Sequence, residues 1–179
     1  INTQFDRISK LHQHEFEVLP TLWTKLSEAF GVVANFVSPI QSYPDLNRMS
    51  NAHLEEFLSK SEPENWQRAE LMDKDDKTSA YQKEIFWHRL RTAKKSCGAF
   101  HNYLITNGIF LQSGLKSQLT SLSDLLWAAL DEKELEEECQ SPRAGRFAKS
   151  DRVRKDGQEM LKKIESDIYA RLWRETKLN

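Results

Sequence analysis

Residues 5–36 read FDRISKLHQHEFEVLPTLWTKLSEAFGVVANF. Positions at alternating spacings of four and three residues in this stretch are apolar, except for His12 and Glu15. This spacing places its members on one side of an α-helix and is close to the heptad pattern of helices that pack side by side. The stretch therefore predicts one long amphipathic helix, which ends before Pro39 and Pro44. The repeating positions, counted from the first residue, are Ile1, Phe5, Ile8, His12, Glu15, Leu19, Leu22, Leu26, Ala29, Val33 and Phe36.

Two histidines and a proline interrupt the apolar pattern of this helix. His12 and His14 point about 200° apart on a helix, so they do not share one metal ion. We interpret His12 and Glu15 as polar positions on the helix seam that set its register against a facing helix, and as candidates for contact with a partner. Pro20 removes one backbone donor and crowds the preceding turn, so it predicts a bend.

Helical periodicity continues through the rest of the sequence, and strand alternation is nearly absent. Two short helices are expected within residues 50–72, separated at Pro63. A long helix follows and ends at Asn107-Gly108, where glycine is the usual left-handed terminator. Its antiparallel partner follows, and a last helix, weakened by about 1 kcal/mol at Gly157, runs to the C-terminus. These patterns predict an all-α fold, an antiparallel helical bundle with a long first helix and an excursion of short helices.

Length and composition narrow the class of protein. A chain of 179 residues predicts a single domain, here 1–179. A net charge of -1 does not indicate nucleic acid or an anionic membrane as a partner. The two cysteines, Cys97 and Cys139, are typical of a reducing compartment. Because the chain begins with Ile1 rather than Met, we expect a fragment of a longer protein with an upstream segment.

No catalytic residue, cofactor or metal ion is predicted, because no phosphate-binding loop, nucleophile elbow or helix-turn-helix signature occurs. Glu84 and His88 stand four residues apart, but one such pair without a second ligand-bearing helix does not predict a metal site. Arg48 and His53 are separated by four residues, the spacing of the ribonuclease motif in HEPN domains, which are helical bundles. This gives an alternative prediction of a ribonuclease or a nucleic-acid-binding domain.

Charge and aromatic residues add two further expectations. Residues 131–138 hold six acids against one base, and residues 143–177 hold eleven bases against six acids. We expect these two segments to attract one another across the bundle rather than to bind nucleic acid. Trp66, Trp87 and Trp173 are expected in the core, although Trp87 beside core Phe86 can leave an aromatic edge for a partner.

Three stretches resemble a recurrent group of bacterial membrane-anchored helical-domain proteins of unknown function. They are RISKLHQHEFEVLPTLWTKLSEAFGVVANFVSP, FHNYLITNGIFLQSGLKSQLTSL and EMLKKIESDIYARLWRE. The resemblance implies a cytoplasmic helical domain that follows a membrane helix and a coiled-coil-like linker, and it supplies no catalytic residue. The chain departs from the group at Pro20 and in the long excursion over residues 40–80.

The sequence thus predicts a non-enzymatic helical interaction or scaffold domain of a bacterial protein, at the inner face of the cell membrane. Its expected partner is a protein or a second copy of itself, and nucleic acid and direct membrane contact are not expected. The candidate contact residues are His12, Glu15 and Trp87, while the alternative nuclease interpretation uses Arg48 and His53.

Overall fold

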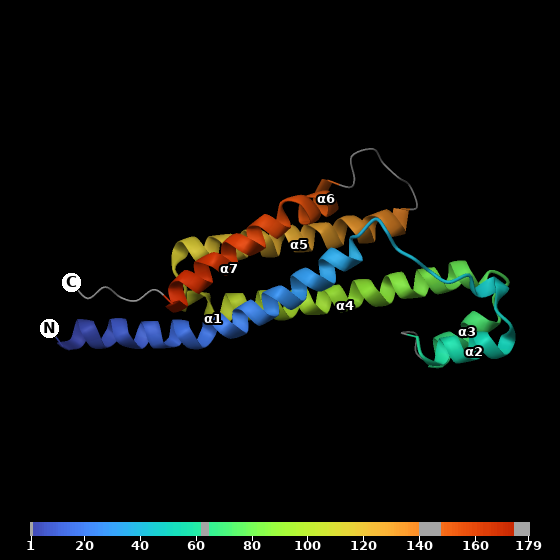
Figure 1. Ribbon diagram of the computed structural model, residues 1–179, viewed down its shortest axis with the longest axis horizontal. Coiled ribbons are helices and arrows are strands. Elements are labelled where there is room, and N and C mark those ends of the chain that lie inside the picture. The colour runs from blue at the N-terminus through green and yellow to red at the C-terminus, as the bar shows by residue number, and fades with distance from the viewer. Residues whose placement is uncertain (1, 62–64, 140–147, 174–179) are drawn as a thin grey trace. The chain divides into compact units, whose positions relative to one another are not determined.

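The computed structural model describes residues 2–61, 65–139 and 148–173, and these residues form helices without a single strand (Figure 1). The all-α prediction is therefore confirmed. Two of the helices are short 3-10 turns, labelled η. In chain order the elements are α1 (Asn2–Phe36), η1 (Leu46–Arg48), α2 (Asn51–Ser59), α3 (Asn65–Met72), α4 (Lys77–Asn107), η2 (Gly108–Phe110), α5 (Ser113–Cys139), α6 (Ala148–Lys155) and α7 (Gly157–Trp173).

Residue contacts divide the chain into two compact units, where the sequence predicted one domain. The first unit, here called the bundle, comprises residues 1–37 and 93–179. The second, here called the excursion, comprises residues 38–92 and contains the two predicted short helices, α2 and α3. Helix α4 begins in the excursion and ends in the bundle.

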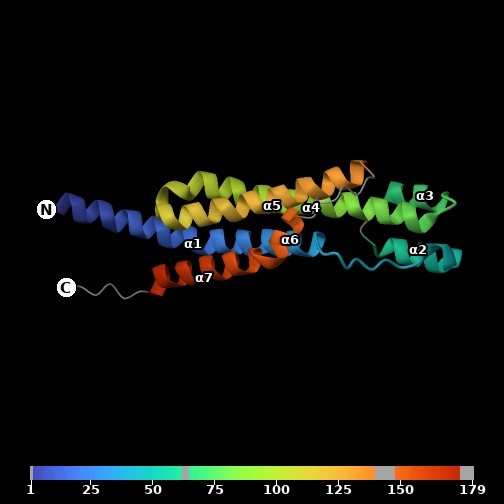
Figure 2. The same cartoon turned by 90° about the horizontal axis from the view of Figure 1, so that it is seen from above.

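The bundle consists of antiparallel helices, as predicted. The last part of α4 turns through η2 into α5, which runs back in the opposite direction, and α6 and α7 return along α5 (Figures 1 and 2). Helix α1 runs antiparallel to α7. It continues as one helix through Pro20, and its axis changes direction along its length, so the predicted bend is present (Figure 1).

The core of the bundle follows the predicted stripes. On α1 the side chains at four-three spacing from Leu19 to Val33 are 0% exposed. The matching stripe of α4 runs through Ala93, Cys97, Phe100 and Leu104, and burial raises the pKa of the Cys97 thiol to about 12. This thiol is therefore a packing group without nucleophilic character. The other helices contribute Leu119, Leu122, Leu126, Leu130, Ile164 and Ile168.

Helix α4 ends at Asn107, as predicted, but with a different terminator, and the predicted last helix is divided. After Asn107 the chain tightens into the 3-10 turn η2, so Gly108 is not a left-handed terminator; a Cβ there would lie 3.1 Å from Cε of Lys116. The last helix is divided at Asp156 into α6 and α7. Gly157 begins α7 where a Cβ would lie only 3.0 Å from Cε2 of Phe30. Glycine at this position therefore allows α1 and α7 to approach each other closely. The low helix propensity of glycine did not by itself indicate this contact.

The aromatic predictions are partly wrong. Trp173 is 70% exposed, because it stands with Tyr169 on the side of α7 that faces away from the buried Ile168. On α4, Ile85 is fully buried and Phe86 only half-buried. The reason is that α4 packs on two different cores, so one continuous stripe does not describe it. The side chain of Trp66, like Pro63, lies outside the described residues.

The excursion has its own small core and a polar connection between η1 and the start of α4. The buried residues are Leu46, Leu54, Leu58, Leu71, Tyr81 and Ile85. Asp76 caps α4 by accepting from the backbone N–H of Ser79 at 3.1 Å, and it also accepts from Asn47 at 2.9 Å. The Thr78 hydroxyl accepts from the backbone N–H of Leu46 at 2.8 Å. These bonds hold η1 against the first turn of α4.

Asp76 should make the excursion sensitive to strong acid. Hydrogen bonds from the side chains of Ser79 and Asn47 lower the pKa of Asp76 from 3.8 to about 2. Because the folded-state pKa is depressed, the stabilisation is complete above pH 3.8 and is lost as the pH falls through about 2. An NMR titration of the Asp76 carboxyl should give a midpoint near 2, and Asn47→Ala should raise it. A midpoint at 3.8 in the unaltered chain would contradict this account.

Gly157→Ala should destabilise the bundle although alanine is the better helix former. The gain in propensity of about 1 kcal/mol is outweighed by the roughly 1–3 kcal/mol of forcing a methyl group against Phe30, which is 3% exposed. Gly98→Ala is the control, since nothing lies within 4 Å of its Cβ position, and should be neutral or stabilising. Urea denaturation compares the two variants, and equal stabilisation by both would show that the Phe30 contact is unimportant.

Candidate functional site

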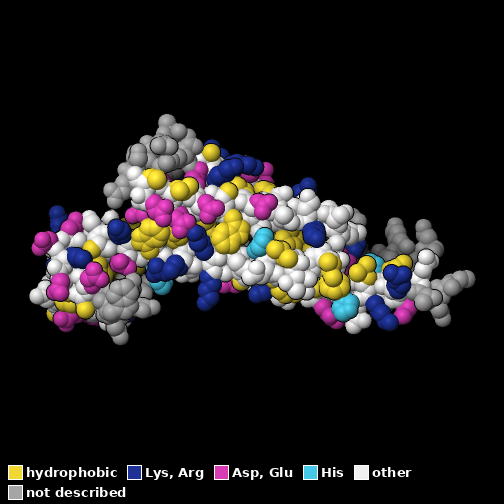
Figure 3. Space-filling view, turned by 180° about the vertical axis from the view of Figure 1, so that it is seen from behind, with side chains coloured by type: hydrophobic (Ala, Val, Ile, Leu, Met, Phe, Trp, Pro, Cys, Tyr) yellow, Lys and Arg dark blue, Asp and Glu magenta, His cyan; other side chains and the backbone are white. Residues whose placement is uncertain are grey.

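Residues 4–14, about three turns near the start of α1, are exposed. Every residue from Gln4 to His14 is exposed, and the first buried position is Glu15. Residues 2–14 are here called the arm. Phe5 is 73% exposed, Ile8 55% and Leu11 48%, so the predicted seam continues outside the core of the bundle. Figure 3 shows hydrophobic side chains at the surface, next to charged and histidine side chains.

The exposed apolar residues of the arm lie on the same side of α1 as its buried residues. Successive helix residues are rotated by about 100°, so Phe5, Ile8 and Leu11 fall within an arc of about 120° that also contains Leu19 and Leu22. We call these three exposed residues the arm stripe. The charged residues lie opposite, where Lys10 pairs with Asp6 at 3.0 Å. The arm is thus a clearly amphipathic helix whose apolar side has no covering element among the described residues.

Glu15 marks the point where the seam enters the bundle. Its side chain is 6% exposed and accepts two hydrogen bonds from Arg171 of α7, from Nε at 3.1 Å and from Nη2 at 2.5 Å. Nδ1 of His12 lies 3.5 Å from Oε2 of Glu15. The structure therefore brings together the two predicted seam residues, His12 and Glu15, and adds Arg171, which the sequence pattern did not single out.

A second contact fixes the base of the arm on the bundle. The His14 ring stacks on Phe110 of η2, with ring centroids 5.1 Å apart, and Nδ1 of His14 lies 3.6 Å from the Glu17 carboxylate. Beside Phe110, Ile109 is 74% exposed. Next to Glu15, Phe16 is 47% exposed. The arm therefore leaves the bundle between α7 and η2, at a base that exposes further apolar side chains.

The other predicted site residues lie in the excursion. Trp87 is half-buried and meets Phe86 edge to face, with ring centroids 5.4 Å apart. Arg48 is 89% exposed and its Nε lies 3.1 Å from Oδ2 of Asp45, while His53 is exposed on α2. The described contacts of Arg48 thus lead to Asp45 rather than to His53, and the nuclease interpretation stays a prediction.

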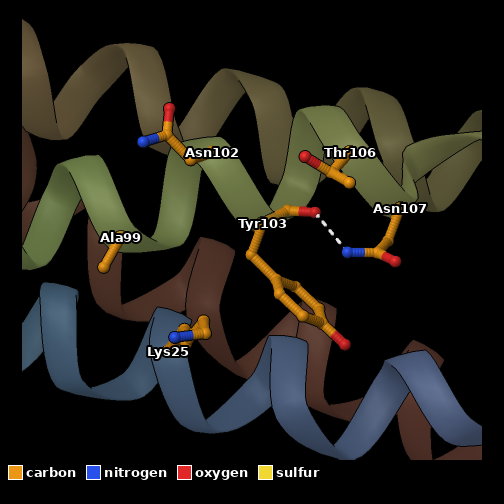
Figure 4. A pocket seen from close by; sticks show the side chains of 6 residues that line it. All are labelled: Lys25, Ala99, Asn102, Tyr103, Thr106 and Asn107. Carbon is orange, nitrogen blue, oxygen red and sulfur yellow. Dashed lines mark hydrogen bonds between the residues drawn. The ribbon is translucent and has the colours of Figure 1, made fainter.

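An open hollow of about 300 Å³ lies between α1 and α4 within the bundle (Figure 4). The Tyr103 ring points from α4 toward α1, and Nζ of Lys25 stands 5.7 Å from the ring centroid. Its remaining lining residues are Ala99, Asn102, Thr106 and Asn107. Of the described residues that line the hollow, Lys25 alone is charged, so they bring together no acid–base pair and no set of metal ligands.

One histidine–serine pair crosses from α4 to α5. Nδ1 of His101 lies 3.2 Å from Oγ of Ser123, but Ser123 is 1% exposed, so no substrate reaches its hydroxyl. In the part of the chain that the structure describes, no group of three potential metal ligands is present. Within the same residues, no helix has the length and apolar character needed to span a membrane.

The acidic segment at the end of α5 is bound differently from the prediction. Glu132 accepts from the backbone N–H groups of Lys149 and Ser150, so it caps α6, and Glu134 pairs with Lys94 of α4 at 2.5 Å. The described contacts of Arg152 and Arg154 are to acids of α6 and its end, not to α5. Among the described residues, the two segments meet at the N-terminus of α6, where the Ser150 hydroxyl also donates to Glu132.

Comparisons with known proteins give no match: no family model, no curated protein and no solved structure is significantly similar to this chain. The resemblance stated above therefore stays a prediction. The interpretation of the arm and its base depends on the geometry of this chain alone.

Arg171→Ala should destabilise the bundle by about 2 kcal/mol, because it leaves the buried Glu15 carboxylate without its partner. The value lies below that of a fully buried pair since the Arg171 side chain is 29% exposed. The control is Arg154→Ala, which removes a pair at the surface of α6 and should cost less than about 0.5 kcal/mol. Urea denaturation measures both, and equal effects would show that the Glu15 pair does not stabilise the bundle.

Proposed function

We propose that this chain is a non-enzymatic helical interaction domain, which binds a protein partner through the arm stripe of α1. The observation that carries the proposal is the continuity of the seam. The same four-three spacing that buries Leu19 and Leu22 inside the bundle continues through Ile8 and Phe5, where the side chains are more than half exposed. An exposed apolar stripe on a helix is the surface that a second helix covers in helix-to-helix recognition.

The base of the arm supports a structural role for the polar residues there. Glu15 is already engaged by Arg171 and His12, so its carboxylate holds this part of α1 against α7. This contact keeps the preceding turns, which form the arm, directed away from the bundle, where a partner can reach them. His12 and Glu15 thus act as positioning residues in the proposal, and the apolar residues form the contact.

The proposed location is the cytoplasmic side of a bacterial membrane, close to the anchor that the resemblance implies. This part of the proposal has only the resemblance in its support. Fractionation of cells that produce the full-length protein tests it, because an anchored protein sediments with membranes and is released by detergent rather than by salt.

Site-specific photocrosslinking tests the interaction directly. A photoreactive amino acid at Leu11, on the arm stripe, should form a protein adduct in the native cells. The matched control is Gln13, which is equally part of the arm and exposed but lies on the opposite side of the helix. Because only the apolar side is proposed to contact the partner, the adduct should be strong at position 11 and weak or absent at position 13.

Two results would count against the proposal. Equal adducts at positions 11 and 13 would indicate non-specific collisions, and no adduct at either position would indicate that the stripe stays uncovered in the cell. Binding of RNA at low salt, lost in Arg48→Ala and His53→Ala, would instead support the nuclease alternative.

A further inference from the structure

We infer that the partner of the arm is a second copy of this chain, so that two copies pair through their arms and the bases of their arms. The inference rests on the proposed function and names the occupant of the same surface. Three properties of the arm support it: the apolar area that it offers, the placement of its charges, and the presence of a second apolar surface at its base.

The exposed apolar surface has the size that a stable dimer needs. The arm stripe together with Phe16 and Ile109 exposes the equivalent of about three whole side chains, or roughly 500 Å² per copy. Apolar atoms make up a little over half of a typical interface, so this corresponds to a total of about 800 Å² per copy. That is the area which each partner contributes to an interface of standard size.

The arm and its base are apolar surfaces of two different forms on one molecule. The arm is a projecting helix about 20 Å long, and the base exposes Phe16, which follows Glu15, and Ile109, which precedes Phe110. Two copies related by a twofold axis offer each other both surfaces at once. Such a contact is closed, because it uses the same residues on both copies and leaves no arm or base free for a third.

The charges of the arm permit this pairing. Asp6 and Lys10 neutralise each other on the side of the helix opposite the stripe. Asp6 and Glu17 are matched in number by Arg7 and Lys10, so two copies bring no net charge together when His12 and His14 are neutral. At the base, the buried Glu15 is already paired with Arg171. No unpaired buried charge is therefore created when the stripe is covered.

A lipid surface is a weaker occupant for the same stripe. Amphipathic helices that lie on membranes are rich in Lys and Arg on their polar side, which attracts anionic lipids. The arm and its base carry Arg7 and Lys10 against Asp6 and Glu17, so together they have no excess of positive charge. The charges thus favour a protein surface as the occupant of the arm stripe. The arm stripe of a second copy is such a surface, and it matches the first in length and polarity.

Sedimentation equilibrium of the 179-residue chain tests the inference. The mass should rise from 20.9 kDa toward twice that value as the concentration increases to about 100 µM, because interfaces of this size reach micromolar affinity or better. The double variant Phe5→Ser/Ile8→Ser should stay monomeric at 100 µM, with dimer affinity reduced at least tenfold. The control is Ile40→Ser, which removes an equally apolar side chain, 85% exposed, from the excursion and should leave the dimer intact.

Each outcome decides the matter. Circular dichroism verifies that the variants keep their helices, which is expected because all substituted side chains are exposed. A monomer at every concentration, or a dimer that persists in Phe5→Ser/Ile8→Ser, overturns the inference. If the chain is monomeric but Leu11 crosslinks to a different protein or to lipid vesicles of neutral composition, the second copy is excluded. A crosslink to a different protein leaves the proposed interaction domain standing. A crosslink to lipid vesicles contradicts the proposed interaction domain as well.

Discussion

Burial of the α1 seam is the constraint on which the bundle depends. From Leu19 to Val33 each seam residue is fully buried against the other helices of the unit, and each buried leucine contributes roughly 2 kcal/mol through the removal of apolar surface from water. This packing fixes the rotation of α1 about its axis. Since a helix is rigid over a few turns, the rotation also fixes the direction in which Phe5, Ile8 and Leu11 point beyond the bundle.

Glu15 and Arg171 separate the buried part of α1 from the exposed arm. Inside this boundary, tertiary packing stabilises the helix. Outside it, residues 4–11 have helix propensity and the Asp6–Lys10 pair, which is worth a few tenths of a kcal/mol, while His14 contacts Phe110 at the base. A helical extension of this length with so little packing is marginally stable in water. A partner that covers the stripe would therefore stabilise the arm. The polar boundary at Glu15 and Arg171 would keep this packing independent of the packing inside the bundle.

Sequence periodicity predicts most of the fold, because the spacing between residues of a helix determines which side of the helix they lie on. It predicts the long first helix, the bend at Pro20, the two short helices and the stripe of α4 after Ala93. Contacts between distant residues are not encoded in spacing, which is why the closeness of Gly157 to Phe30 and the split at Asp156 were missed. Similarly, Trp173 has the apolar character of a core residue, and only the packing of α7 shows that it faces away.

The candidate site was predicted in part. His12 and Glu15 were recognised as polar positions on a seam, and the expectation that Glu15 reaches a facing helix is met by Arg171. The identity of Arg171 required the tertiary arrangement. Exposure of the arm could not be predicted either, because the same four-three spacing describes a helix face buried within one chain and a face that binds another. For Arg48 and His53 the spacing alone gave an interpretation that no described contact supports.

The central claim is that the arm stripe is covered by a second copy of the chain. Amide hydrogen exchange of residues 5–14, measured at low and at high protein concentration, tests it most directly, with the amides of the buried part of α1 as an internal reference. We expect rapid exchange in the arm at about 1 µM and clear protection at about 100 µM, while the reference amides stay protected throughout. Arm amides that exchange at the same rate at both concentrations would contradict the account.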